Sequence, residues 1–162
     1  MKKALLAIFL FFSFNLYGAG AKIDIPKYDW SWKGFFGTYD RASAQRGLKV
    51  YREVCAGCHS MNYLSYRNLA DLGFSGDHIK AIAAEHLVLD GPNDEGEMFE
   101  RDGIPSDQFV NPYLNEKAAR AANNGAYPPD LSLIVKARPK GADYIKALLL
   151  GYVDPPEDLK VP

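Results

Sequence analysis

The sequence predicts one mainly α-helical domain with long loops, and three observations support this fold class. The 162 residues, of which 48% are hydrophobic and 24% charged, suffice for a single domain with a buried core. Apolar residues recur at helical spacing in several segments, whereas alternating strand patterns are scarce. Only two cysteines occur, so a framework of disulfides is excluded. The formal net charge of −1 is also unlike the basic surface of a nucleic-acid-binding protein.

Residues 1–21 have the features of a secretory signal peptide. Lys2 and Lys3 precede an apolar run over 4–14, and the small residues of 19–21 supply an A-x-A cleavage site. The apolar run is shorter than the roughly 20 residues that a membrane-spanning helix needs, so we prefer a cleaved signal to an anchor. The prediction is therefore export to a bacterial periplasm, with the mature domain over 22–162.

The mature chain begins with an aromatic segment, residues 22–39. Pro26, Gly34 and Gly37 argue against a long helix there. We expect an extended strap that closes over a core, and the alternative is an aromatic stacking platform.

Two helices are predicted in the first half of the domain. One spans 42–59, where residues at spacings of three or four form one face. That face holds Leu48, Tyr51, Cys55 and Cys58. The other runs from about Asp77 to Leu87, with Ser75 as its N-terminal cap.

The second half is predicted to begin with a loop and to continue as three short helices. Residues 90–114 are rich in Gly, Pro, Asp and Asn and show no clear period, which is typical of a long functional loop. Helices are expected over 116–124, capped by Asn115, and then over 131–137 and 141–150.

The segment Cys55-Ala56-Gly57-Cys58-His59 has the C-x-x-C-H pattern of c-type haem attachment. Two cysteines three positions apart on a helix lie on the same side. Each thiol can then add to one vinyl group at the porphyrin edge, and His59 can reach the iron as an axial ligand. The pattern predicts one covalently attached haem c.

Three other interpretations of these cysteines are weaker. A zinc site needs four ligands, and the only histidines besides His59 are His78 and His86. A thioredoxin-like redox pair would lie near a βαβ pattern, which the sequence lacks. The third alternative is an inert structural disulfide.

The sequence offers no convincing ligand for the opposite face of the haem iron. Met61 follows His59 too closely to reach that face easily, and Met98 lies in the long loop. His78 and His86 fall on a predicted helix, where surface or core roles are more common. Either the iron is five-coordinate or the chain is incomplete.

Four long blocks of the sequence resemble the cytochrome c1 family, the haem subunit of cytochrome bc1 complexes. The resemblance runs from about Tyr28 to the C-terminus. The blocks are RGLKVYREVCAGCHSMNYLSYRNL at 46–69, DGPNDEGEMFERDGIPSD at 90–107, NEKAARAANNGAYPPDLSLIVKAR at 115–138 and DYIKALLLGYVDPPED at 143–158. They are not shared with ordinary soluble cytochromes c.

The resemblance implies a class I cytochrome c-like helical haem domain that transfers electrons and is not catalytic on its own. It would accept electrons from the Rieske iron–sulfur protein, pass them to a cytochrome c, and assemble with cytochrome b in ubiquinol–cytochrome c reductase. Its place would be the periplasmic face of the bacterial inner membrane, held by a C-terminal helix. The family's distal methionine and anchor correspond to sequence beyond Pro162, so we expect an N-terminal part of a longer reading frame.

The resemblance also assigns haem-binding roles to individual residues. These are Cys55, Cys58, His59, Asn123, Pro129, Arg138 and Tyr144. His59 would ligate the iron, Pro129 would orient His59, and Asn123 would lie near the haem. Arg138 and Tyr144 would contact a haem propionate. A partly buried propionate needs a charge-assisted partner, which supports Arg138 on physical grounds, and the alternative is a solvated arginine at a helix end.

The sequence departs from the family at one further point, and both the role of the acidic loop and the function leave alternatives open. Pro139-Lys140 stands where the family commonly has His-Gly. The acidic residues of 90–102 form either a plain solvated loop or a surface that steers a basic cytochrome c. The alternatives to an electron-transfer subunit are a five-coordinate haem sensor or peroxidase-like protein, and a free soluble cytochrome c.

Overall fold

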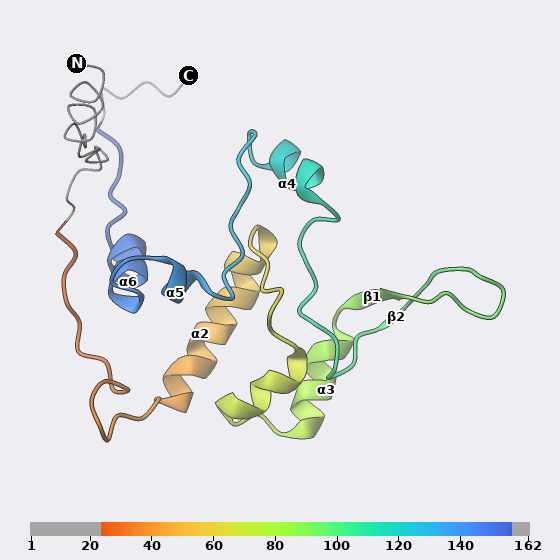
Figure 1. The fold of residues 1–162 in the computed structure, drawn as a ribbon, viewed down its shortest axis with the longest axis horizontal. Helices are drawn as coiled ribbons and strands as arrows, with labels where there is room; N and C mark the ends of the chain where they lie inside the picture. Colours follow the sequence, from red (N-terminus) through yellow and green to blue (C-terminus); the bar gives the residue numbers. More distant parts are fainter. Residues whose placement is uncertain (1–23, 157–162) are drawn as a thin grey trace, which may run out of the picture.

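The computed structural model describes residues 24–156, and the predicted signal peptide lies outside them. Short helices are joined by long loops, and one small sheet is present (Figure 1). The helices are α2 (Arg41–Glu53), α3 (Gly76–Ala84), α4 (Glu116–Ala122), α5 (Ile134–Ala137) and α6 (Ala142–Leu150), with the 3₁₀ segments η1 (Cys55–Gly57) and η2 (Tyr66–Leu72). The strands are β1 (Leu87–Asp90) and β2 (Phe99–Asp102). No helix within 24–156 is long and apolar enough to cross a membrane.

The first predicted helix is shorter than expected. Helix α2 begins behind Asp40, whose side chain accepts a hydrogen bond from the Ser43 amide at 3.2 Å. It ends at Glu53, because the backbone of Val54 leaves the helical region at φ −123°. The prediction that both cysteines lie on one α-helical face was therefore wrong: they lie in the tighter turn that follows.

The other predicted caps are present. Ser75 accepts a hydrogen bond from the amide of His78 at the start of α3, and Asn115 accepts one from Ala118 at the start of α4. Helix α3 stops at Ala84, three residues before the predicted end, and the chain enters β1. The 3₁₀ helix η2 was not predicted.

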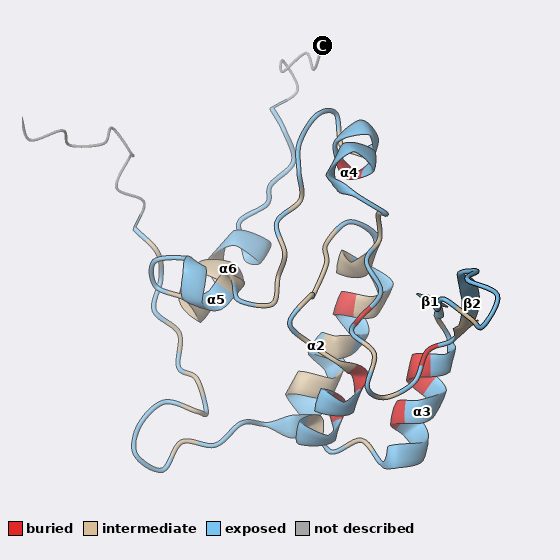
Figure 2. Ribbon diagram, turned by 45° about the vertical axis from the view of Figure 1, so that its right-hand side comes forward, coloured by how far each residue is buried: buried red, intermediate tan, exposed pale blue. Residues whose placement is uncertain are grey.

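The core of the described part is built almost entirely by residues 41–109. Figure 2 shows the buried positions gathered on α2, on α3 and on the segments between them. The core cluster consists of Tyr51, Tyr66, Leu69, Ile79, Ile82, Ala83 and Phe109. Helices α5 and α6 contain no buried residue.

A hairpin occupies part of the predicted long loop. Strands β1 and β2 pair antiparallel, from Leu87 opposite Asp102 to Asp90 opposite Phe99. The four-residue strands are mostly exposed, so they carry no clear alternation of apolar and polar residues. The sequence pattern therefore did not predict them.

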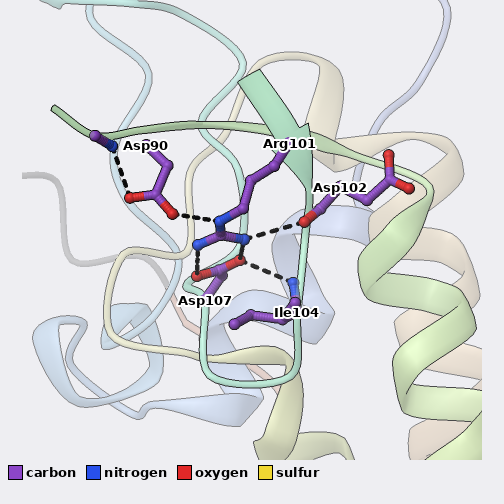
Figure 3. Close-up of polar contacts among 6 residues, drawn as sticks. Asp90, Arg101, Asp102, Ile104 and Asp107 are labelled. Carbon is purple, nitrogen blue, oxygen red and sulfur yellow. Dashed lines mark hydrogen bonds and ion pairs between the residues drawn. The ribbon is translucent and has the colours of Figure 1, made fainter. Parts of the chain in front are cut away.

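Arg101 fastens the base of this hairpin (Figure 3). Its guanidinium pairs with Asp90, and its two terminal nitrogens donate to Asp107 at 2.7 and 3.0 Å. Asp107 also accepts from the amide of Ile104 at 2.8 Å, and its carbonyl accepts from the amide of Tyr66 at 3.0 Å. The hairpin is thus tied to η2 and, through it, to the core. Hydrogen bonds from Arg101 hold the pKa of Asp90 and of Asp107 below the ordinary value.

The aromatic strap packs on α6 rather than over the core. Asp143 of α6 accepts from the indole nitrogen of Trp30 at 2.6 Å and from the amide of Tyr28 at 3.2 Å. The ammonium of Lys146 lies 4.1 Å from the centre of the Tyr28 ring. The expectation that the strap closes over a core was therefore wrong. The surface that the strap covers is that of α6.

Candidate functional site

The C-x-x-C-H segment forms one compact turn directly after α2. The amides of Cys58 and His59 both donate to the carbonyl of Cys55, at 3.1 and 2.8 Å. The two thiols are not joined to each other. Cys55 is half-buried against the core, whereas Cys58 is exposed. Two thiols and an imidazole are thus presented within five residues.

The imidazole of His59 is oriented by a segment 70 positions away in the sequence. Its Nδ1 lies 2.8 Å from the carbonyl oxygen of Pro129. A carbonyl only accepts hydrogen bonds, so Nδ1 carries the proton and donates it. The other ring nitrogen, Nε2, then keeps its lone pair, which is the form of histidine that binds a metal.

The backbone of His59 is held by Tyr51. The hydroxyl of Tyr51 donates to the carbonyl oxygen of His59 at 3.2 Å. Burial raises the pKa of this hydroxyl to about 12, and the charge of Asp130 acts in the same direction. Tyr51 therefore remains protonated, and able to donate, throughout the physiological pH range.

The Pro129 turn is joined to the segment after His59 by Asp130. One carboxylate oxygen accepts from the Ser60 hydroxyl and from the amide of Asn62, both at 2.8 Å. The other oxygen accepts from the amide of Ser132 at 2.8 Å. Burial alone would raise the pKa of Asp130, but these hydrogen bonds outweigh it and hold the pKa below its ordinary value.

The clamp that Asp130 makes between these two segments was not predicted from the sequence. The available signal was Asp130-Leu131-Ser132 before a short helix, a pattern in which an aspartate caps the backbone two residues ahead. The partner on the other side, Ser60, gives no signal of its own because the contact spans 70 positions.

Three other predicted site residues make no direct hydrogen bond to the C-x-x-C-H turn. Asn123, the C-cap of α4, donates to the Tyr113 hydroxyl at 3.1 Å and to the carbonyl of Ala119 in that helix at 2.7 Å. Arg138 is exposed at the end of α5. Tyr144 lies on α6, in a groove that strap residues also line. No hydrogen bond or ion pair recorded for 24–156 joins these three to residues 55–59.

The candidates for a second axial ligand come from different segments of the chain. Met98 is 55% exposed in the hairpin loop, and Met61 packs against the core. His78 is exposed on α3, and His86 stacks on Tyr66 with ring centres 5.8 Å apart. In the described ranges no group of three or more His, Cys, Asp or Glu side chains is arranged to hold a metal ion.

The chemistry of the donor set fits a c-type haem. The two unbonded thiols would supply the covalent attachments, and Nε2 of His59 would be available to bind the iron. Tyr127 and Leu133, which flank Pro129 in the sequence, are each about half exposed. Tyr127 lines a pocket together with Cys58, so its ring would offer apolar surface to a flat macrocycle there.

Comparison with known proteins agrees with this chemistry. A family model described as the cytochrome C1 family matches residues 30–162. "Cytochrome c1 1, heme protein, mitochondrial" from Arabidopsis thaliana is 55% identical over 139 residues, 86% of this chain and 45% of that protein. "Cytochrome c1" from Rhodospirillum rubrum is 55% identical over 130 residues, 80% of this chain and 48% of that protein.

The name of a relative from Candida albicans describes it as a subunit of a complex. "Cytochrome b-c1 complex catalytic subunit, mitochondrial" is 53% identical over 131 residues, 81% of this chain and 46% of that protein. The chain spans about half the length of the curated relatives it matches.

Proposed function

The chain belongs to the cytochrome C1 family, and from this membership we propose that it carries one covalent haem c and transfers electrons. When bound, haem supplies reversible one-electron chemistry at its iron. The observation that carries the proposal is the hydrogen bond from His59 Nδ1 to the Pro129 carbonyl, 2.8 Å long, beside two unbonded thiols. It leaves Nε2 ready to bind iron.

Each predicted site residue has a separate role in holding the cofactor in this proposal. Cys55 and Cys58 form the thioether bonds, and His59 binds the iron through Nε2. Pro129 fixes the rotation of the imidazole through its carbonyl oxygen. Arg138 and Tyr144 are proposed propionate partners in a class I cytochrome c-like domain. Asn123 is the weakest of the candidates, because its side-chain amide already donates to Tyr113 and to Ala119 of α4.

The proposed partners are those of a cytochrome bc1 complex. The names of the relatives support membership in this membrane-associated complex. Within it, the chain would take electrons from the Rieske iron–sulfur protein beside cytochrome b and pass them to a cytochrome c. The proposed location is the periplasmic face of a bacterial inner membrane, reached through the signal peptide of 1–21.

Expression with the c-haem maturation machinery tests this proposal. We expect haem that survives denaturing electrophoresis and a c-type pyridine haemochrome spectrum with one haem per chain. The double variant Cys55→Ala/Cys58→Ala should lose all covalent haem, because no other cysteine exists in the chain. Val54→Ala is the matched control, since Val54 adjoins the motif but is 69% exposed. A wild-type chain without covalent haem would refute the proposal.

A further inference from the structure

We propose that Asp130 is a positioning residue for the axial ligand His59. Its carboxylate holds residues 60–63 against residues 129–132, which keeps the Pro129 carbonyl on the imidazole Nδ1. The inference rests on the proposed function, because it concerns the histidine that would bind the haem iron.

The bonds around Asp130 join the two segments at several points. Besides the three donors to the carboxylate, the amide of Leu131 donates to the carbonyl of Ser60 at 2.9 Å. The amide of Tyr63 donates to the hydroxyl of Ser132 at 3.1 Å. The amide of Ser132 in turn donates to Asp130, so this one carboxylate binds groups from both segments.

Asp130 is ionised and sits among neutral donors. Hydroxyl and backbone N–H groups face its two oxygens, and no cation takes part in these bonds. Hydrogen bonds to a charged acceptor are about twice as strong as neutral ones. An asparagine of the same shape would lose the charge and would point N–H groups at either the Ser60 and Asn62 donors or the Ser132 donor. It therefore cannot satisfy the whole set.

The effect reaches the imidazole through one peptide unit. Pro129 directly precedes Asp130, and the φ angle of Pro129 is restricted by its own ring. A fixed Asp130 therefore fixes the direction of the Pro129 carbonyl. A strong Nδ1–H bond makes the imidazole a better electron donor to a metal. A looser carbonyl would weaken that bond, favour the ferrous state and raise the midpoint potential.

The test compares Asp130→Asn with Asp107→Asn in the haem-loaded chain. Asp107 is a fair control because it is also a carboxylate of lowered pKa that accepts a backbone hydrogen bond, from Ile104. It belongs to the Arg101 cluster of Figure 3 and has no bond to 59–63 or 129–132 among those recorded for the described residues. Both variants should lose stability, but only Asp130→Asn should alter the ligand.

Two measurements report on the ligand directly. The exchange of the His59 Nδ1 proton with solvent deuterium is followed by NMR in the ferrous form, with carbon monoxide added to keep the iron diamagnetic. We expect about tenfold faster exchange in Asp130→Asn, the result of losing one to two net hydrogen bonds, and a rise in midpoint potential. Asp107→Asn should match the wild type in both measurements. Ser60→Ala removes a single donor and should change both in the same direction but less, so it serves if Asp130→Asn does not fold.

The outcomes separate this inference from the proposed function. Wild-type chain without covalent haem refutes the proposed function and the inference with it. Normal haem content with unchanged proton exchange and potential in Asp130→Asn, or in Ser60→Ala where it replaces that variant, refutes the inference alone. Equal changes in Asp107→Asn and Asp130→Asn would also refute it, because the effect would then follow general destabilisation.

Discussion

Residues 41–109 and residues 110–156 are stabilised in different ways. Seven of the eight buried hydrophobic residues in the described part lie in the first region, and Ala119 alone lies in the second. Leu131 of the second region packs against the core, and polar contacts join that region at Asp130 to the ligand turn and at Asp143 to the strap. The first region thus has a core of its own, whereas the second is attached by one partly buried leucine and several directional bonds.

The difference shows why the candidate site lies at the junction of the two regions. His59 belongs to the first region and is anchored there by Tyr51. Pro129, which orients its ring, belongs to the second. A rigid core supplies the ligand backbone, and a polar clamp sets the ligand's rotation. The proposed haem would add apolar contacts where the second region has few of its own.

The largest expected effect is on the free energy of unfolding, and it contrasts one leucine from each region. Leu69 is 4% exposed in the core and Leu149 is 65% exposed on α6. Leu69→Ala should cost about 2–5 kcal/mol, because it deletes buried methyl groups and leaves a cavity. Leu149→Ala should cost less than about 1 kcal/mol. Urea unfolding followed by circular dichroism measures both, and equal costs would remove the distinction between the regions.

Haem attachment should protect the second region more than the first. Amide hydrogen exchange in residues 111–150 is expected to slow more on haem attachment than exchange in residues 66–83, which the core already protects. The comparison is made between the wild type and the Cys55→Ala/Cys58→Ala variant by mass spectrometry. Uniform protection of both regions would mean that the second region gains nothing specific from the haem.

The sequence predicted local features of both regions well and long-range features poorly. The caps Ser75 and Asn115 and the location of α6 followed from residue type and period. The end of α2 did not, since the chain leaves the helix at Val54 without a glycine or proline to mark the place. The hairpin was missed because its exposed strands depend on the Arg101 cluster rather than on an apolar pattern.

The candidate site shows the same division. Cys55, Cys58 and His59 lie within five residues of one another, so a local pattern was enough to predict their role. Pro129 came from family resemblance. The clamp by Asp130 was not predicted, because its partner Ser60 lies 70 positions away and gives no signal of its own. The roles of Arg138 and Tyr144 remain predictions that rest on resemblance.

Acid should weaken both regions through their paired carboxylates. The folded-state pKa values of Asp107 and Asp130 lie below the ordinary value of about 3.9, so their stabilisation is complete above that pH. It is lost as the pH falls through the lowered folded-state values. Asp107→Asn and Asp130→Asn should each be less stable at pH 7 but lose less on acidification, as measured by urea midpoints between pH 7 and pH 2. If the urea midpoints of the variants fall as steeply on acidification as those of the wild type, these two carboxylates are not the source of the acid sensitivity.

The smallest effect on stability is expected at the hairpin tip, where Asp94, Glu95 and Glu97 are exposed. Neutralising all three should change the free energy of unfolding by less than about 0.5 kcal/mol, because the Arg101 cluster at the base remains intact. If these charges steer a basic cytochrome c, the variant should show slower electron transfer at low salt and a weaker dependence of the rate on ionic strength.

The control for the hairpin variant is neutralisation of Asp29, Asp71 and Asp154, three exposed acids outside the hairpin. It changes the net charge equally but leaves the tip intact. A salt dependence that falls equally in both variants would show that net charge, and not the hairpin, guides the partner. A salt dependence unchanged in the hairpin variant would leave the tip as a plain solvated loop. Because the tip can lose its charges without loosening the core, either result reports on docking and not on folding.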